Sequence, residues 1–296
     1  MGHPCNARAG RDTIGRVKDV LVVGAGLSGL TAAWYLAEAG ATVRVVDAAP
    51  RAGGLIETVA TPDGPVETAA NAFVRSPRVD ALFAALSITP NTPLKVSGKR
   101  YIFRDGRPRR WPLTIGETAS MAVRFVGAQI QRRVSAGERE TVADWGRRVL
   151  GGAATDWLVG PALHGIYASP AEVLSARAIA ASRPKGRREF VAPPDGMGQF
   201  TSRLREALVA RRVRFELGCA ISADELVSAV PTVIATNAPA AARLLAPHAP
   251  AFAAAAARIR IAPASPVTAF FEPSPDDLRG FGVLFPRAAV LESSSW

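Results

Sequence analysis

Three glycines and one acid near the start of the sequence have the residue types and the spacing that bind a dinucleotide. Gly24, Gly26 and Gly29 form the pattern G-x-G-x-x-G. In such a pattern the first glycine permits a tight turn, the second lets the backbone approach a pyrophosphate, and the third lets a helix pack closely on a strand. Asp47 follows about 20 residues later, where a carboxylate binds ribose hydroxyls and repels the 2′-phosphate of NADP. These residues predict a site for NAD or FAD.

The sequence around these residues predicts the elements that a dinucleotide site requires. Residues 20–23 form a short apolar run, typical of a strand buried on both faces of a parallel sheet. Residues 27–39 have apolar side chains at helical spacing, and residues 42–46 form a second apolar strand that ends at the acid. Together these features are a far more specific signal than the glycines alone. The positive end of the helix should face the phosphates, with the binding stretch formed by Gly24, Ala25, Gly26, Leu27, Ser28 and Gly29.

A second glycine-rich segment distinguishes between the two dinucleotides. Arg51, Gly53 and Gly54 follow the acid, and residues 65–73 read PVETAANAF. Paired glycines carry no side chains that would obstruct a ligand along the backbone. Together with the first motif, these segments resemble the flavin-dependent amine oxidase and desaturase superfamily. The resemblance implies that the cofactor is FAD and that Arg51, Gly53 and Gly54 lie along it.

The resemblance assigns further residues to FAD. It implies that Asp47 and Ala48 hold the adenosine ribose and that Ile221 meets the adenine. The flavin ring would be lined by Leu55, Ala69, Ala70, Asn71 and Ala72.

Four segments further along the chain resemble the protoporphyrinogen oxidase family. They are residues 99–113 (KRYIFRDGRPRRWPL), 165–169 (GIYAS), 194–200 (PDGMGQF) and 280–286 (GFGVLFP). The resemblance implies an enzyme of haem biosynthesis that oxidises protoporphyrinogen IX or coproporphyrinogen III to the porphyrin, with oxygen as the acceptor. Arg100 matches the arginine that pairs with a propionate, and a planar guanidinium suits a carboxylate. Two alternatives stay open, namely another flavin amine oxidase or carotenoid-type desaturase, and an inactive truncated fragment.

The expected fold class is α/β, with a split FAD-binding Rossmann-like domain and an inserted, largely helical substrate domain. We expect a disordered tail over residues 1–19 and the FAD-binding domain over 20–85 and 191–246. The insertion should occupy residues 86–190, and residues 247–296 should form substrate-domain strands with an incomplete C-terminus. Members of the family continue beyond this point with a further flavin-binding segment, so the resemblance also predicts a truncated chain.

Composition excludes several other classes of protein. The net charge is +11, but almost all of the 36 basic residues are arginines in an alanine-rich chain, and no nucleic-acid-binding module is present. We therefore predict no nucleic-acid partner. Two cysteines are too few for a disulfide framework or a four-ligand zinc site, so we predict no metal and a cytoplasmic location. No apolar run approaches the roughly 20 residues that span a bilayer.

The remaining expectations concern partners and catalysis. Residues 115–134 predict an amphipathic helix with an apolar stripe, which is typically core-facing. The resemblance also allows peripheral contact with the inner face of the cell membrane, and a homodimer. No catalytic residue is assigned, because the flavin would perform the difficult step. His164 lies in an apolar segment and is predicted to be packed and hydrogen-bonded. The apolar stripe consists of Ile115, Ala119, Ala122, Val126 and Ile130.

Overall fold

The computed structural model describes residues 19–93, 98–182, 189–227, 230–261, 264–270 and 280–286. They form two compact units. The first contains the described residues up to 92 together with 189–261 and 265–270, and the remaining described residues form the second. The second unit starts at residue 93 and its first segment ends at residue 188, whereas the expected insertion spans residues 86–190. The predicted tail lies outside the described residues except for Asp19, which already belongs to the first strand.

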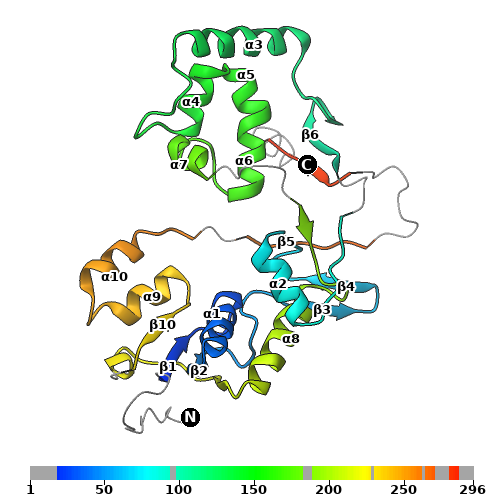
Figure 1. Cartoon of the computed structure of the whole chain (residues 1–296). Coiled ribbons are helices and arrows are strands. Elements are labelled where there is room, and N and C mark those ends of the chain that lie inside the picture. The colour runs from blue at the N-terminus through cyan, green and yellow to red at the C-terminus, as the bar shows by residue number, and fades with distance from the viewer. Residues whose placement is uncertain are drawn as a thin grey trace, which may run out of the picture. The chain divides into compact units, whose positions relative to one another are not determined.

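A four-stranded parallel sheet forms the centre of the first unit (Figure 1). The strands lie in the order β10-β1-β2-β9, and Val22 of β1 is paired with Val45 of β2 and Val233 of β10. This arrangement confirms the predicted α/β fold class. Because helices cover both faces of a parallel sheet, its central strands are largely apolar, and Val20–Val23, Val43, Val45 and Val46 are buried. The strands are β1 (Asp19–Val23), β2 (Thr42–Asp47), β9 (Arg214–Leu217) and β10 (Thr232–Ile234).

The core of the first unit lies where helices α1 and α8 pack against this sheet. Leu30 and Trp34 of α1 meet Phe200 and Leu204 of α8, and all four are buried. The ring of Phe200 also packs against the ring of Phe73, with centroids 4.7 Å apart. Full burial of one such side chain contributes about 1.5–3 kcal/mol, so these helices are held firmly on the sheet. The helices are α1 (Leu27–Glu38), α2 (Pro77–Ala85), α8 (Met197–Ala210), η3 (Asp224–Val227), α9 (Ala238–Leu245) and α10 (Pro250–Ala257).

Two small antiparallel pairs complete the first unit. Strands β3 (Thr58–Thr61) and β4 (Gly64–Glu67) form a hairpin, and β5 (Phe73–Val74) pairs with β8 (Phe190–Val191). The chain after residue 246 differs from the expectation of substrate-domain strands. Its residues 250–257 form α10, which packs against α9 in the first unit, because an alanine-rich segment has a strong helix propensity.

The second unit combines helices with a three-stranded sheet in the order β11-β6-β7. Gly282–Leu284 pairs in parallel with the start of β6, although about 180 residues separate the two strands in the sequence. The strands are β6 (Arg100–Arg104), β7 (Arg107–Arg109) and β11 (Gly282–Leu284). The helices are α3 (Ile115–Ile130), α4 (Val142–Val149), α5 (Gly152–Ala154), the π-helix η2 (Thr155–Val159), α6 (Gly160–Tyr167) and α7 (Ala176–Ala181).

Candidate functional site

The turn between β1 and α1 has the geometry that the glycine pattern predicts. Gly24 has a φ of +110°, and a Cβ there would lie 2.8 Å from the carbonyl oxygen of Ala235. A Cβ on Gly29 would overlap the carbonyl group of Gly24. A Cβ on Gly26, by contrast, would meet only Gly54, at 3.7 Å. Two of the glycines are thus required by packing, whereas the backbone beside Gly26 stays open for a ligand.

The N-terminus of α1 provides hydrogen-bond donors for an anion. Gly26 is the N-cap residue, and no described side chain caps the helix. Leu27 is half-buried and Ser28 is exposed, and as first-turn residues their amide groups have no partner within the helix. Uncapped amides at the positive end of a helix form an anion site. The loop therefore fits the pyrophosphate of a dinucleotide.

Asp47 lies beside this loop at the end of β2. Its Oδ2 accepts a hydrogen bond of 2.5 Å from the amide of Ala25, and its Oδ1 accepts one of 2.8 Å from the amide of Ala49. Each carboxylate oxygen can accept a second bond, so the acid can still receive ribose hydroxyls. Ala48 is exposed next to it. The bond to Ala25 shows that Asp47 also holds the glycine loop, a role that spacing alone does not reveal.

The second glycine segment is joined directly to the first. The amide of Gly53 donates to the carbonyl oxygen of Ala25 at 2.8 Å. Arg51 donates to the carbonyl oxygens of Gly54 (2.9 Å) and Ile56 (3.1 Å) and forms an ion pair with Glu57. Its guanidinium therefore holds this loop in place through the loop's own backbone.

The residues predicted to line the flavin lie near one another. Leu55 is 84% exposed, and its carbonyl oxygen accepts a hydrogen bond of 2.8 Å from Thr68 Oγ1. This bond links Leu55 to the predicted segment that follows Thr68, in which Ala69, Ala70 and Asn71 are exposed and Ala72 is half-buried. An exposed leucine beside small residues suits a flat apolar ring. Thr68 is the residue that joins the two segments, and sequence reasoning does not identify it.

Ile221 lies near the end of β2 that carries the acid. It packs against the cluster of Leu21, Val23 and Val46, and the amide of Cys219 donates to the backbone oxygen of Asp47 at 2.9 Å. The structure thus brings the residue predicted to meet adenine close to the residue predicted to bind ribose.

In the second unit, Arg100 is exposed at the start of β6. Its Cζ lies 5.2 Å from the ring centroid of Phe281, and within the described part of the chain no carboxylate is within ion-pair distance of it. A cation stacked on an aromatic ring with free donors can capture a carboxylate. The position suits the predicted role of Arg100.

Arg104, on the same strand, is engaged within the protein. It donates two hydrogen bonds, of 2.7 and 2.9 Å, to the carboxylate of Glu117. Its Cζ also lies 4.4 Å from the ring centroid of Trp157. The hydrogen bond from Arg104, with further ones at Thr114, lowers the pKa of Glu117 from 4.5 to about 2. Arg104 is therefore structural, and Arg100 is the arginine of β6 that stays exposed.

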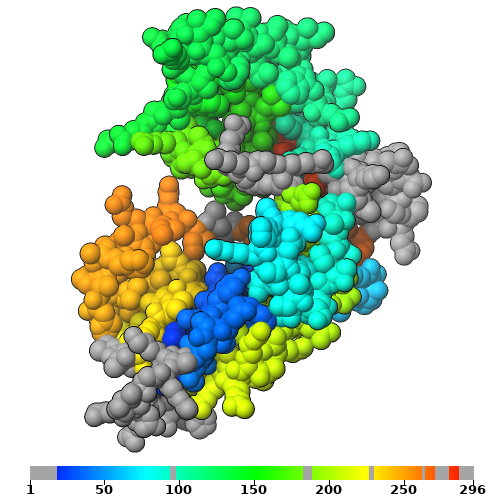
Figure 2. Space-filling view, viewed as in Figure 1, coloured from blue at the N-terminus to red at the C-terminus, as the bar shows by residue number. Residues whose placement is uncertain are grey.

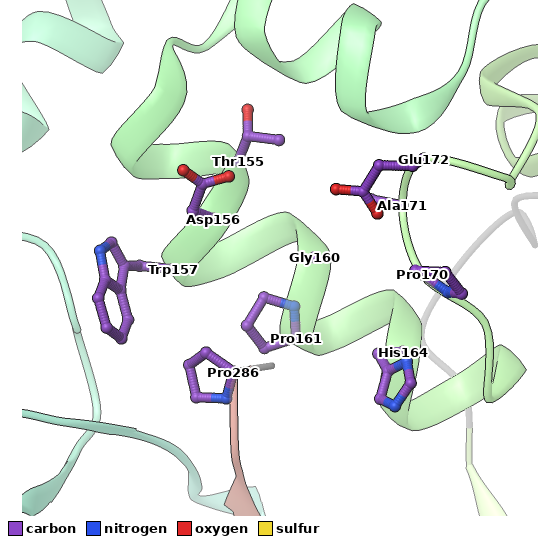
Figure 3. Close-up of a pocket in the computed structure, with 10 residues that line it drawn as sticks. All are labelled: Thr155, Asp156, Trp157, Gly160, Pro161, His164, Pro170, Ala171, Glu172 and Pro286. Carbon is purple, nitrogen blue, oxygen red and sulfur yellow. The ribbon is translucent and has the colours of Figure 1, made fainter. Parts of the chain in front are cut away.

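A cavity of about 280 Å³ lies between η2, α6 and the chain near Pro286 (Figure 3). Asp156 and Glu172 line it. The guanidinium of Arg147 forms ion pairs with both carboxylates, at 3.7 Å from Asp156 Oδ1 and 4.0 Å from Glu172 Oε1. His164 also lines the cavity and is exposed, so the prediction of a packed histidine is wrong. An apolar sequence context does not decide which way one turn of a helix faces. With two carboxylates in its lining, this cavity does not suit a carboxylate-bearing substrate.

Two general properties of the described residues bear on function. Within the described ranges, no three His, Cys, Asp or Glu side chains are grouped so that they could hold a metal ion. Nor does any helix in those ranges combine the length and the apolarity needed to cross a membrane.

Comparison with known proteins places the nucleotide-binding region in a recognised family. Residues 22–86 match the NAD(P)-binding Rossmann-like domain. Protoporphyrinogen oxidase 2 of Arabidopsis thaliana is 31% identical over 173 residues, which are 53% of this chain and 34% of that protein. Hydroxyneurosporene desaturase of Rhodobacter capsulatus is 46% identical over 67 residues, 23% of this chain and 14% of the desaturase. The chain spans about a third of the length of the plant relative.

The fold is shared with solved structures. A protein assigned as a protoporphyrinogen oxidase from Exiguobacterium sp. 255-15 superposes with a TM-score of 0.58 at 19% identity. The superposition covers 80% of this chain and 64% of the other. The relatives are oxidoreductases, and the chain shares their Rossmann-like nucleotide-binding fold.

Proposed function

We propose that this chain, a relative of the protoporphyrinogen oxidases in the flavin-dependent amine oxidase and desaturase superfamily, binds FAD and oxidises a porphyrinogen. The observation that carries the proposal is the junction of the two glycine segments, where Gly53 bonds to Ala25 beside the uncapped N-terminus of α1. A dinucleotide that crosses this junction passes from Asp47 toward Leu55. The apolar surface at Leu55 favours the flavin ring of FAD over NAD.

The residues of the chain would bind, orient and shield the reactants. When bound, FAD supplies the chemistry by accepting a hydride. The amides at the start of α1 would bind its pyrophosphate, and Asp47 would bind the ribose. Leu55 and the alanines after Thr68 would keep water from the ring. Arg100 would hold a propionate and so orient the macrocycle, which lowers the barrier by positioning.

The visible spectrum of the purified protein tests this proposal. We expect flavin absorption bands, release of FAD on denaturation, and bleaching of the bands when protoporphyrinogen IX is added without oxygen. Bleaching by a polyene or an amine, with no response to porphyrinogen, would instead favour a desaturase or an amine oxidase. A colourless protein that takes up no added FAD would contradict the proposal.

Replacing Arg100 tests the substrate class. A charge-assisted hydrogen bond contributes about 1.5–3 kcal/mol, so we expect Arg100→Ala to raise KM for the porphyrinogen about 10- to 100-fold. The KM of Arg100→Lys should lie between those of the unaltered protein and Arg100→Ala, because an ammonium keeps the charge but not the bidentate geometry. Arg107→Ala, an exposed arginine on the neighbouring strand, is the control and should leave KM unchanged. If the KM of Arg100→Ala were unaltered, Arg100 would not bind the substrate.

A membrane surface is the second partner that we propose, and helix α3 is the contact. The polar side of α3 faces its own unit, since Glu117 binds Arg104 and Thr118 accepts a bond from Trp111 Nε1. Within α3 no residue is buried, and Ile115 and Ile130 of the stripe are 91% and 77% exposed. Figure 2 shows the side chains of α3 in green at the top of the view, open to solvent. The helix thus has its apolar stripe on the outside, the reverse of a core-facing helix.

Anionic lipid is the occupant that suits this surface. Arg132 and Arg133 are exposed directly after α3, and basic residues beside an exposed apolar stripe favour an anionic bilayer. We expect Val126→Asp to reduce co-sedimentation with phosphatidylglycerol vesicles about tenfold, because it removes an apolar group that would enter the bilayer and adds a negative charge that anionic lipid repels. Ser120→Asp adds the same charge away from the stripe and is the control. Equal losses in both variants would show that net charge, and not the stripe, determines binding.

A further inference from the structure

The start of helix α8 is capped by two residues that are distant in the sequence. The amide of Met197 donates to Glu67 Oε1 at 2.8 Å, and the amide of Gly198 donates to Thr58 Oγ1, also at 2.8 Å. The Thr58 hydroxyl donates in turn to the Glu67 carboxylate at 2.9 Å. No side chain from the residues next to the helix caps it. The base of the β3–β4 hairpin therefore supplies the cap that the local sequence lacks.

Glycine makes this cap possible. The N-cap residue Gly196 has a φ of +89°, and a Cβ there would lie 2.5 Å from Thr58 Oγ1 and 2.6 Å from Glu67 Oε1. A Cβ on Gly198 would lie 2.9 Å from the amide nitrogen of Thr58. The helix end and the hairpin thus fit together without room for a side chain. A carboxylate at the positive end of a helix adds a favourable charge interaction to the two hydrogen bonds.

The hairpin base is connected directly to the segments that are proposed to line the flavin. Leu55 lies three residues before Thr58, and Ala69 lies two residues after Glu67. Thr68 bonds to the carbonyl oxygens of Leu55 and Glu57, so both strand ends move together. Beyond this capped end, the side chains of Phe200 and Leu204 on α8 pack on α1, the helix that would hold the pyrophosphate.

We propose that Glu67 and Thr58 are positioning residues for the flavin ring. They dock the hairpin base on α8 and thereby set the ring-lining segments relative to the phosphate loop. This inference rests on the proposed function, because the group to be positioned is FAD. It adds that the affinity for FAD depends on two side chains that do not touch the cofactor.

A set of variants with FAD as the probe tests the inference. Glu67→Ala removes the acceptor and the charge, whereas Glu67→Gln keeps an acceptor oxygen. Thr58→Val removes the hydroxyl at constant shape, whereas Thr58→Ser keeps it. Asp63→Ala, in the exposed turn of the same hairpin, is the control.

Two measurements separate the cap from its effect on FAD. In the FAD-free protein, we expect amide hydrogen exchange in residues 196–199 to be at least tenfold faster in Glu67→Ala and Thr58→Val than in Asp63→Ala. We expect these two variants to bind FAD about tenfold more weakly and to alter the visible circular dichroism of the bound flavin. Glu67→Gln should lose less affinity than Glu67→Ala, and Thr58→Ser should restore affinity to within about twofold.

Each result has a distinct meaning. If amide hydrogen exchange in residues 196–199 were unchanged in Glu67→Ala, Glu67 would not cap α8, and the inference would be wrong. Faster exchange with unchanged FAD affinity and an unchanged flavin spectrum would overturn the positioning role, because the cap would then serve stability alone. If the unaltered protein bound no FAD, the proposed function and the positioning role would both fall, and the exchange rates would still decide whether the cap exists.

Discussion

Replacing Gly29 with alanine is expected to destabilise the nucleotide-binding unit severely. The new Cβ would overlap the carbonyl group of Gly24 and would lie 3.4 Å from Ala235 Cβ. No rotamer change relieves this overlap, because the nearest atoms belong to the backbone. Overpacking that side chains can relieve typically costs 1–3 kcal/mol, so we expect a loss of about 4 kcal/mol or more. That loss is a large part of the 5–15 kcal/mol that stabilises a typical domain.

Thermal unfolding followed by circular dichroism measures this effect. A loss of this size lowers the melting temperature of a unit of this length by about 10 °C or leaves the protein insoluble. Gly127→Ala is the matched control, because a Cβ on Gly127, within α3, would have no atom within 4 Å. That variant should be neutral or stabilised by up to about 1 kcal/mol. A Gly29→Ala protein that melts like the unaltered chain would show that α1 and β1 are not in close contact.

Replacing Gly26 with alanine is expected to abolish tight FAD binding without unfolding the protein. The φ of Gly26 is −70°, which alanine adopts readily, and the added Cβ would make only an ordinary contact of 3.7 Å with Gly54. In a G-x-G-x-x-G loop the second glycine leaves room for the pyrophosphate, so the methyl group displaces the phosphates from the α1 amides. We expect the Kd for FAD to rise about 100-fold, equivalent to about 2.8 kcal/mol.

Fluorescence titration of FAD into the apoprotein gives this Kd, and the melting temperature of the apoprotein reports the fold. The two glycine variants should therefore differ, with Gly26→Ala as stable as the unaltered protein but weak in FAD binding, and Gly29→Ala strongly destabilised. Gly116→Ala, whose Cβ would meet no atom within 4 Å, controls for the exchange of glycine for alanine in a helix. An unchanged FAD affinity in Gly26→Ala would exclude this loop as the phosphate site.

The opening of the nucleotide-binding domain could be predicted from the sequence almost residue by residue. The predicted elements at 20–23, 27–39 and 42–46 correspond to β1 (Asp19–Val23), α1 (Leu27–Glu38) and β2 (Thr42–Asp47). The prediction succeeds because every determinant is local. Apolar runs, helical periodicity and the steric needs of the glycines all lie within about 30 consecutive residues.

Contacts between distant segments could not be predicted in this way. Glu67 and Met197 are 130 residues apart, and in the sequence Glu67 is one acid among 25. The same holds on β6, where Arg100 and Arg104 look alike until Glu117 and the ring of Trp157 engage one of them. Which polar group finds a partner depends on the packing of whole elements, and no local pattern encodes it.

The outward direction of a helix face is the other property that sequence patterns leave open. The stripe on α3 correctly indicates an amphipathic helix, but its periodicity is the same whether the apolar side faces a core or the solvent. His164 was misplaced for the same reason. The dinucleotide-binding motif follows from the sequence because backbone sterics dictate it. The orientation of α3, the cap on α8 and the availability of Arg100 follow from the tertiary structure, since each depends on which surfaces the folded units bring into contact.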